Sequence, residues 1–500
     1  MTLTRVLTSS SVLALLAGPA MADLTAEDVL ADQLAQMALY GLDVQAQGQS
    51  RSGATLNVAS LTASANIPEE DVSLSFTMGG ASFTEQGDGT VLVTYPAEIP
   101  INVQVDAPGD DDVTVDMVLR QSGMQMLASG DPSQFRYEFT GQSASIDDIR
   151  FAGLDEADEV DMQFDVSLSG LQGIMNIAAG EVRPFDVDMT IDAMTILMSV
   201  NEPGGDGTFD LNFDLTSLVA SYAGAVAQQN IMNSFAETIA TGNRTAGTMN
   251  HGAATYNIAF DGPEGGFSGQ FGIGSGNYTF AMDESGIDYG GTQQNVTATV
   301  GGSAIPFPPM TFKMAESGGR FQIPVVPGED EQDFALAISM IGLEVDPFLW
   351  SMIDPGGQLP QDPANLVIDT NGRLILTQDI FAPEFAEQPM TAPPGQINAL
   401  TVNRINLALA GAELTGDGDL TFNNQFGIPM PVGVVNLGLT GGNTLLDTLV
   451  GMGLIPQEQA MGARMMSGMF ARPGDGPDSL VSTIEMKEDG SILANGQRIK

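Results

Sequence analysis

The sequence predicts a mainly β fold with a few helices, in which helices pack against long, curved antiparallel sheets. Strict alternation of apolar and polar residues recurs along the chain, most clearly in Val160 to Leu168, Phe185 to Asp192 and Phe209 to Thr216. A period of two gives each strand one buried and one wet face, as in antiparallel sheets. Gly-rich turn signals separate the alternating runs, and only a few segments have a helical period. The predicted turns include 87–89, 205–207 and Asn371-Gly372.

The first 22 residues predict a secretory signal peptide. Arg5 supplies the charge, Val12 to Ala17 the apolar stretch and Ala20 to Ala22 an A-x-A cleavage site. The apolar stretch is shorter than the roughly 20 residues that span a bilayer, and no later run reaches that length, so we expect no transmembrane helix. The mature chain, 23–500, is therefore expected in the periplasm. It has no Cys, and its length allows a core that needs no disulfides.

A helix is predicted at the start of the mature chain. Thr25-x-x-Asp28 resembles a capping box, Leu30, Leu34 and Met37 share one face, and Gly41 ends the helix. Alternating runs follow from about Val44. Further runs begin near Leu56, Val72, Val91, Ile101, Val113, Asn277, Val296, Phe334, Leu374, Val402, Leu420 and Val435.

Other helical patterns are few. The longest is Ser217 to Thr241, and shorter ones are Asp346 to Ile353, Thr444 to Met452 and Gln457 to Phe470. The last carries Met461, Met465, Met466 and Met469, which we interpret as core residues, the alternative being an adaptable apolar surface.

Two stretches are typical of linkers. These are Thr241 to Ala253, rich in Gly and Asn, and Pro383 to Pro394, rich in Pro. We therefore expect a strand-rich N-terminal half with the opening helix, 23–245, and a strand-rich C-terminal half with short Met-rich helices, 246–500. The alternative is one continuous sheet across residue 245.

The charge balance narrows the range of partners. The formal charge is −47, with 63 acidic and 16 basic residues, and loss of Arg5 with the signal peptide makes it −48. Such a surface repels phosphates, so nucleic-acid binding is not expected. Acidity also keeps a protein soluble in a salty medium, which screens the repulsion.

Residues for common catalytic chemistry are scarce. His251 is the only histidine and is expected in a linker, away from any nucleophile motif. No G-x-S-x-G, S-x-x-K or phosphate-binding loop occurs, and Zn²⁺ sites of the usual Cys and His type are excluded. We predict no catalytic residue and no cofactor. A carboxylate-dependent hydrolase remains an alternative, because a glycosidase needs only two acidic residues.

A row of carboxylates permits a metal hypothesis. The polar faces of the three clearest strands carry Asp161, Asp165, Asp186, Asp188, Asp192, Asp210 and Asp214. Calcium binds such oxygen ligands, and 109–112 and 416–419 are the nearest loop candidates. No calcium-loop motif occurs, so we expect a solvated acidic face and no metal site.

Several turn and strand segments resemble a known family. They are Gly89 to Pro96, Glu413 to Leu420, Leu437 to Pro456 and Met486 to Leu493. Over most of the mature chain, the protein resembles the secreted alphaproteobacterial proteins of domain-of-unknown-function family 2125. The family has no assigned activity, so the resemblance implies no residue roles. Its general look is similar to strand-rich envelope proteins whose curved sheets handle lipids, an analogy of fold.

These observations favour a non-catalytic periplasmic protein of the cell envelope, with a binding or scaffold role. A long sheet with one apolar face must cover that face with helices, a second sheet or a hydrophobic ligand. A lipid or an envelope protein is the expected partner, and the ligand-binding residues are not identified. The alternatives are a sandwich of two sheets, an outer-membrane β-barrel and the carboxylate hydrolase.

Overall fold

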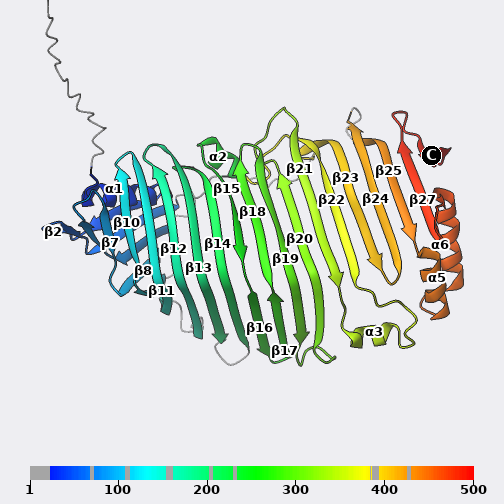
Figure 1. The fold of residues 1–500 in the computed structure, drawn as a ribbon, viewed down its shortest axis with the longest axis horizontal. Helices are drawn as coiled ribbons and strands as arrows, with labels where there is room; N and C mark the ends of the chain where they lie inside the picture. The colour runs from blue at the N-terminus through cyan, green and yellow to red at the C-terminus, as the bar shows by residue number, and fades with distance from the viewer. Residues whose placement is uncertain are drawn as a thin grey trace, which may run out of the picture.

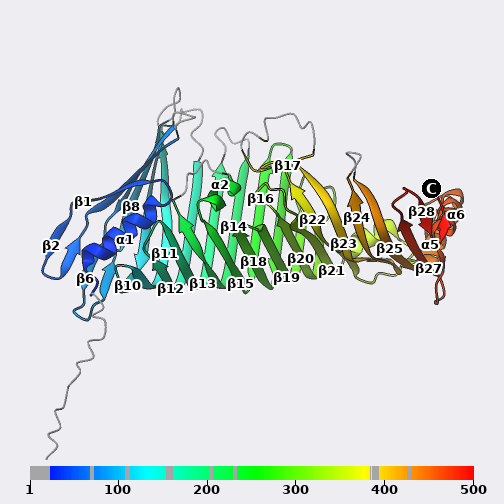
Figure 2. The same cartoon turned by 90° about the horizontal axis from the view of Figure 1, so that it is seen from above.

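The protein is a single, elongated antiparallel sheet with helices mainly at its ends (Figure 1). The computed structural model describes residues 23–67, 72–106, 113–153, 161–201, 207–228, 234–382, 385, 393–424 and 429–500. The predicted signal peptide lies outside these ranges. Strands make up 64% of the structure and helices 12%, which confirms the mainly β prediction. Figure 2 shows the strands standing side by side along the whole molecule.

The N-terminal end of the sheet divides into two branches at β11 (Gln134–Ala152), whose two halves pair with different strands. The first half continues through β10 (Gln125–Asp131), β7 (Val91–Thr94), β6 (Ser82–Glu85), β3 (Thr55–Asn57) and β2 (Ser50–Ser52). The second half continues through β9 (Val113–Ser122), β8 (Glu98–Asp106), β5 (Val72–Gly79), β4 (Ser60–Ile67) and β1 (Asp43–Gln47).

From β11 onward the chain is a meander. It runs through β12 (Asp161–Ala178), β13 (Val182–Asn201) and β14 (Thr208–Ala227). Next to β14, two shorter strands lie end to end, β15 (Arg244–His251) and β16 (Ala254–Gly262), and both pair with β14. Beside them β18 (Ser275–Asp283) pairs with β15, and β17 (Gly265–Ile273) pairs with β16. The meander continues with β19 (Gly286–Gly301), β20 (Met310–Ile323), β21 (Gln332–Leu343), β22 (Ala364–Leu376), β23 (Gly395–Leu409), β24 (Ala412–Asn423) and β25 (Met430–Thr440). It ends with β27 (Ser479–Met486), β28 (Ile492–Ala494) and β29 (Gln497–Arg498), while β26 (Arg472–Pro473) pairs with β27.

The described helices are short. They are α1 (Ala26–Ala38), α2 (Phe235–Ala240), α3 (Pro347–Ile353), α5 (Gly442–Gly451) and α6 (Gln457–Phe470). The Thr25 and Asp28 capping box is present, which confirms the predicted start of α1. The helices predicted near 346–353, 444–452 and 457–470 are confirmed as α3, α5 and α6.

The long helix predicted from Ser217 is wrong. Residues up to Ala227 belong to β14, and among the described residues of 217–241 the helical segment is α2. Ser217 has a left-handed backbone, with φ of 53°, where the pairing of β14 with β13 is interrupted. Before Ser217 the apolar residues of β14 stand at odd positions, and the last of them is Leu215. After Ser217 they stand at even positions, beginning with Leu218. The resulting spacing of three resembles one helical turn.

Two other local predictions also fail. The supposed linker at 241–253 contains β15, which pairs with both β14 and β18. Asn371-Gly372 lies inside β22 rather than in a turn. The turn at 87–89 is present, and both of its glycines have positive φ. Residues 205 and 206 and most of 383–394 lie outside the described ranges. Strands on both sides of residue 245 are hydrogen-bonded in one sheet.

A buried cluster of charged and polar groups attaches α1 to the sheet. Asp32 of α1 forms an ion pair with Arg183 of β13, and both side chains are almost fully buried. The Tyr137 hydroxyl donates to the same carboxylate, and Gln36 Nε2 donates to it at 2.7 Å. Burial raises the pKa of Tyr137, so its phenol stays neutral. Around the cluster lies a hydrophobic core of buried residues, which includes Val29, Phe83 and Phe135.

Replacing Arg183 should strongly destabilise the protein. In R183M the Asp32 carboxylate would remain buried without its cation, which costs about 3–5 kcal/mol. Urea unfolding of residues 23–500 measures this change. The double variant D32L/R183M is the control, because removal of both charges should recover most of the loss. Equal destabilisation of the single and double variants would contradict the argument.

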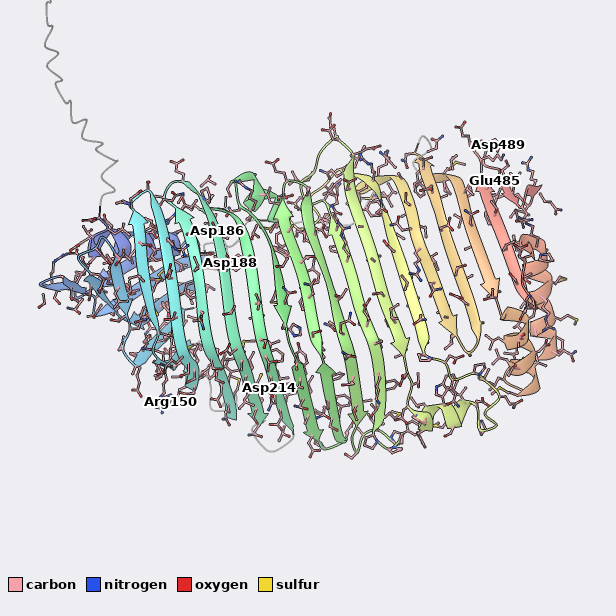
Figure 3. The ribbon with its side chains drawn as sticks, in the orientation of Figure 1. Arg150, Asp186, Asp188, Asp214, Glu485 and Asp489 are labelled. Atoms are coloured by element: carbon pink, nitrogen blue, oxygen red, sulfur yellow. The ribbon has the colours of Figure 1, made fainter. Side chains whose placement is uncertain are left out.

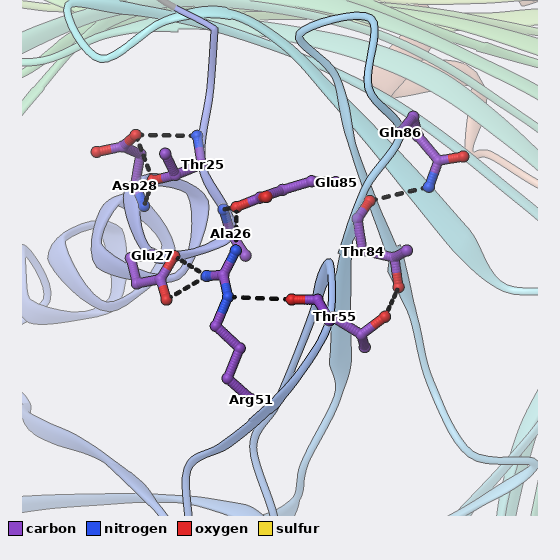
Figure 4. A network of polar contacts seen from close by, with 10 residues as sticks. Thr25, Ala26, Glu27, Asp28, Arg51, Thr55, Thr84, Glu85 and Gln86 are labelled. Atoms are coloured by element: carbon purple, nitrogen blue, oxygen red, sulfur yellow. Dashed lines mark hydrogen bonds and ion pairs between the residues drawn. The ribbon is translucent and has the colours of Figure 1, made fainter.

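A second polar network, shown in Figure 4, joins the first turn of α1 to β2 and β6, in the branch that continues from the first half of β11. Arg51 Nη1 donates to Glu27 Oε2 at 2.6 Å, and its Nη2 donates to Glu85 Oε1 at 2.8 Å. The Ala26 amide also donates to Glu85. Hydrogen bonds from Arg51 hold the pKa values of Glu27 and Glu85 below their usual range.

This network predicts a specific pH dependence. Because the native pKa values of both glutamates are lowered, their stabilisation is present above about pH 4.3 and is lost as the pH falls through the native values. In R51Q the pKa values rise toward normal, so the free energy of unfolding should fall less steeply below about pH 5. Urea titrations from pH 7 to pH 2 should show the two proteins converging in acid. Parallel curves would contradict this.

Candidate apolar binding surface

A continuous line of uncharged residues crosses one face of the sheet. Residues opposite each other in an antiparallel ladder share a face, so the register defines this line, which we call the apolar row. It consists of Val91, Ala128, Tyr137, Met175, Val187, Tyr222, Gly247, Phe280, Tyr289, Phe321, Leu336, Thr370, Val402, Gly418, Val435 and Ile484. At about 4.8 Å per strand, the row is about 70 Å long.

The centre of the apolar row is exposed. Phe280, Tyr289, Phe321 and Leu336 are direct partners on four successive strands, with exposed fractions of 40%, 48%, 44% and 45%. Tyr222 is also among the exposed large apolar residues. Burial nevertheless raises the pKa of the Tyr222 and Tyr289 phenols, so both rings are neutral near pH 7. We call the part from Tyr222 to Leu336 the open stretch.

A helix covers the N-terminal end of the apolar row, and another helix borders its C-terminal end. Under α1, Val91, Ala128 and Tyr137 are fully buried. A pocket of about 280 Å³ beside α1 contains Val187 and Tyr222, so it leads from the covered end toward the open stretch. At the other end, Ile484 and Phe470 of α6 line an apolar pocket of about 430 Å³.

Glycines leave space for the aromatic rings on this face of the sheet. A Cβ on Gly291 would lie 2.5 Å from the Tyr278 ring, and one on Gly247 would lie 2.5 Å from Tyr222 Cβ. Cross-strand glycines of this kind leave room for the rings against the backbone. The open stretch is therefore a shallow surface and not an enclosed cavity.

The other face of the sheet is polar. Among the predicted acidic residues, Asp186 and Asp188 lie along β13 and Asp214 lies on β14 (Figure 3). Neutral groups on neighbouring strands donate to their carboxylates: Asn176 to Asp186 at 2.7 Å, Ser221 to Asp188 at 2.5 Å and Thr195 to Asp214 at 2.8 Å. Asp210 likewise accepts from Ser199 of β13, and Asp165 accepts from Gln163 of its own strand. These five carboxylates have hydrogen-bonding partners without a cation.

The structure brings no metal ligands together in the parts that it describes. Within those ranges there is no group of three or more His, Cys, Asp or Glu that could hold a metal ion. Asp417 and Asp419 lie within β24 and accept from Asn436 and Thr401. The candidate at 109–112 lies outside the described residues. Among the described helices, none is long and apolar enough to cross a bilayer.

His251 is placed at the end of β15 and not in a linker. It is buried and stacks on Tyr278, with ring centroids 5.7 Å apart. Its Nδ1 donates to the Gly252 carbonyl at 2.7 Å, and Gln293 Nε2 donates to the Tyr278 hydroxyl at 2.9 Å. A Cβ on Gly276 would lie 2.2 Å from its Nε2. These contacts support a packing role.

The interpretation of the Met-rich helix as core is wrong. Met461, Met465, Met466 and Met469 of α6 are all more than 60% exposed, and Ala460 is the buried residue of this helix. The helix borders a single-layer sheet, so it has only one side to bury. The alternative of an apolar surface is the one that the structure supports.

The fold thus defines a class: an open, single-layer antiparallel sheet with one apolar and one polar face. The sequence model of a family described as uncharacterized protein conserved in bacteria (DUF2125) matches residues 292–495. The expected family resemblance is confirmed over this segment, which runs from β19 to β28. The expected resemblance at 89–96 lies outside the match. No curated protein and no solved structure matches the chain.

The apolar row could not be listed from the sequence, because register decides which residues stand opposite each other. Alternation does mark the residues of each strand that share a face, such as Tyr278 and Phe280. The signal that was available and missed is the Gly content of strands rich in aromatic residues, as in 265–283.

A substitution at Gly247 should disturb the apolar row through the backbone. A Cβ there would lie 2.5 Å from the Ser221 carbonyl oxygen, so G247A should lower the free energy of unfolding by about 1–3 kcal/mol. Gly462 of α6 is the control, because a Cβ there meets nothing within 4 Å. G462A should be neutral or stabilising by up to about 1 kcal/mol. Urea unfolding compares the two, and equal effects would contradict the prediction.

Proposed function

We propose that the protein is exported to the periplasm and binds lipid acyl chains along the open stretch of the apolar row. The observation that carries the proposal is the exposure of Phe280, Tyr289, Phe321 and Leu336 as direct neighbours on one face. Contiguous apolar patches of this kind on soluble proteins mark binding surfaces. The signal peptide predicted at 1–22 supports export.

The dimensions of the surface suit an acyl chain. The open stretch crosses six neighbouring strands, from Tyr222 on the first to Leu336 on the last, so it is about 25 Å long. One leaflet of a bilayer holds its acyl chains within about 15 Å, half of the hydrocarbon thickness. An extended chain therefore fits along the open stretch with room at its ends.

The energetics also favour an apolar ligand. Removal of apolar area from water stabilises a complex by about 25 cal/mol per Å², and the exposed rings supply such area. The uncharged row leaves no ionic group to desolvate when a chain binds. The opposite face, with its carboxylates, remains in water.

The direct test is analysis of co-purified lipid. Residues 23–500 are purified from the periplasm without detergent, extracted with organic solvent and analysed by mass spectrometry. We expect lipid in stoichiometric amount. A clean extract from folded, soluble protein would contradict acyl-chain binding and leave the scaffold role.

Substitutions in the open stretch should weaken binding. Y289Q/F321Q removes two exposed rings, and at about 1 kcal/mol each the affinity for a fluorescent fatty acid should fall about 30-fold. V219Q is the matched control: Val219 is 47% exposed on the same sheet, but it pairs with Thr190 and Asn250 on the polar face. Fluorescence titration measures both. An equal loss in the control would show that binding does not depend on the row.

A further inference from the structure

The exposed side of α6 is an unexplained apolar surface. Met461, Met465 and Met469 recur every four residues, and Met466 flanks them. Their exposed fractions are 62%, 69%, 61% and 61% in the order of the sequence. We call these four residues the Met face. Figure 1 places α6 at the C-terminal end of the sheet, beyond β27.

Polar contacts on the inner side of α6 fix this orientation. Arg464 donates through Nε to Asn443 Oδ1 at 3.1 Å and forms an ion pair with Asp447 of α5 at 2.6 Å. The Ser482 hydroxyl of β27 donates to the Phe470 carbonyl at the end of α6. The only basic side chain of α6 therefore faces α5, and the Met face points outward.

The segment that contains α5 and α6 differs in charge from the chain as a whole. Residues 442–472 contain two acids, Asp447 and Glu458, and two bases, Arg464 and Arg472, so their net charge is zero. The whole chain carries −47. Few carboxylates of this segment would therefore have to lose water when it meets an apolar or zwitterionic surface.

The size of the Met face argues against a stable protein partner. A helix of 14 residues is about 21 Å long and about 10 Å wide, a footprint of about 200 Å². Stable protein interfaces bury about 800 Å² on each partner. A second copy of this chain would also bring its own charge of −47. A bilayer needs only shallow insertion of an apolar helix face, and flexible Met side chains adapt to it.

We propose that α6 docks on a membrane surface of uncharged or zwitterionic headgroups by inserting its Met face. This docking rests on α6 itself and not on the proposed acyl-chain binding. If both hold, docking brings the end of the apolar row to the bilayer, since Phe470 and Ile484 line one pocket. The membrane would then be the source or the acceptor of the bound chains.

The test is flotation of residues 23–500 with phosphatidylcholine vesicles. We expect the wild type to float with the vesicles, and M465Q/M469Q to float at least fivefold less, because Gln keeps helix propensity and length but is polar. The control is M352Q: Met352 of α3 is 52% exposed, away from the Met face. It should float like the wild type. Added phosphatidylglycerol should reduce flotation at low salt, because the chain is anionic.

Three outcomes would overturn the proposal. The first is folded wild type that does not float, and the second is equal flotation of both variants. The third is a wild-type dimer that M465Q/M469Q converts to monomer in light scattering without any flotation, which would identify a second copy as the partner. Fatty-acid titration of M465Q/M469Q separates the two proposals: its affinity should be unchanged, whereas Y289Q/F321Q should lose affinity and still float.

Discussion

Strand register is the constraint on which the structure depends. A slip of one residue between two strands turns every side chain beyond it to the opposite face. The pairing from Tyr137 to Ile484 holds uncharged residues in one line across the sheet, despite bulges between β21 and β22 and between β22 and β23. The same register places Asp188 opposite Ser221, so the carboxylates gather on the face that stays in water.

A single-layer sheet has no second layer to cover its apolar side, and the protein meets this problem differently at its ends and its centre. At the N-terminal end α1 covers the row, held by the buried Asp32 and Arg183 pair. Such a pair costs desolvation energy, but it specifies one position for the helix. At the C-terminal end α6 borders the pocket that contains Ile484. Between them the face is open.

The open stretch and the Met face are two apolar surfaces with different shapes. The open stretch is long and shallow, and glycines let its rings lie against the backbone, as for Tyr278 beside Gly291. The Met face is small, flexible and set in a neutral segment. Both lie on parts of the molecule where carboxylates are few, while the polar face carries much of the acidity. A ligand that is apolar along its length and uncharged at its head meets no repulsion at either surface.

The sequence by itself determined the elements whose signals are local: the alternating strands, the capping box at Thr25 and the approximate positions of α3, α5 and α6. It misplaced a helix after Ser217, because one left-handed residue changes the apolar spacing from two to three and the backbone conformation is decided by neighbouring strands. It also assigned the Met face to the core, since amphipathic spacing shows that residues share a side of the helix but not what lies against that side. Only the tertiary structure decided the register, the open stretch and the absence of a second layer over the centre of the described sheet.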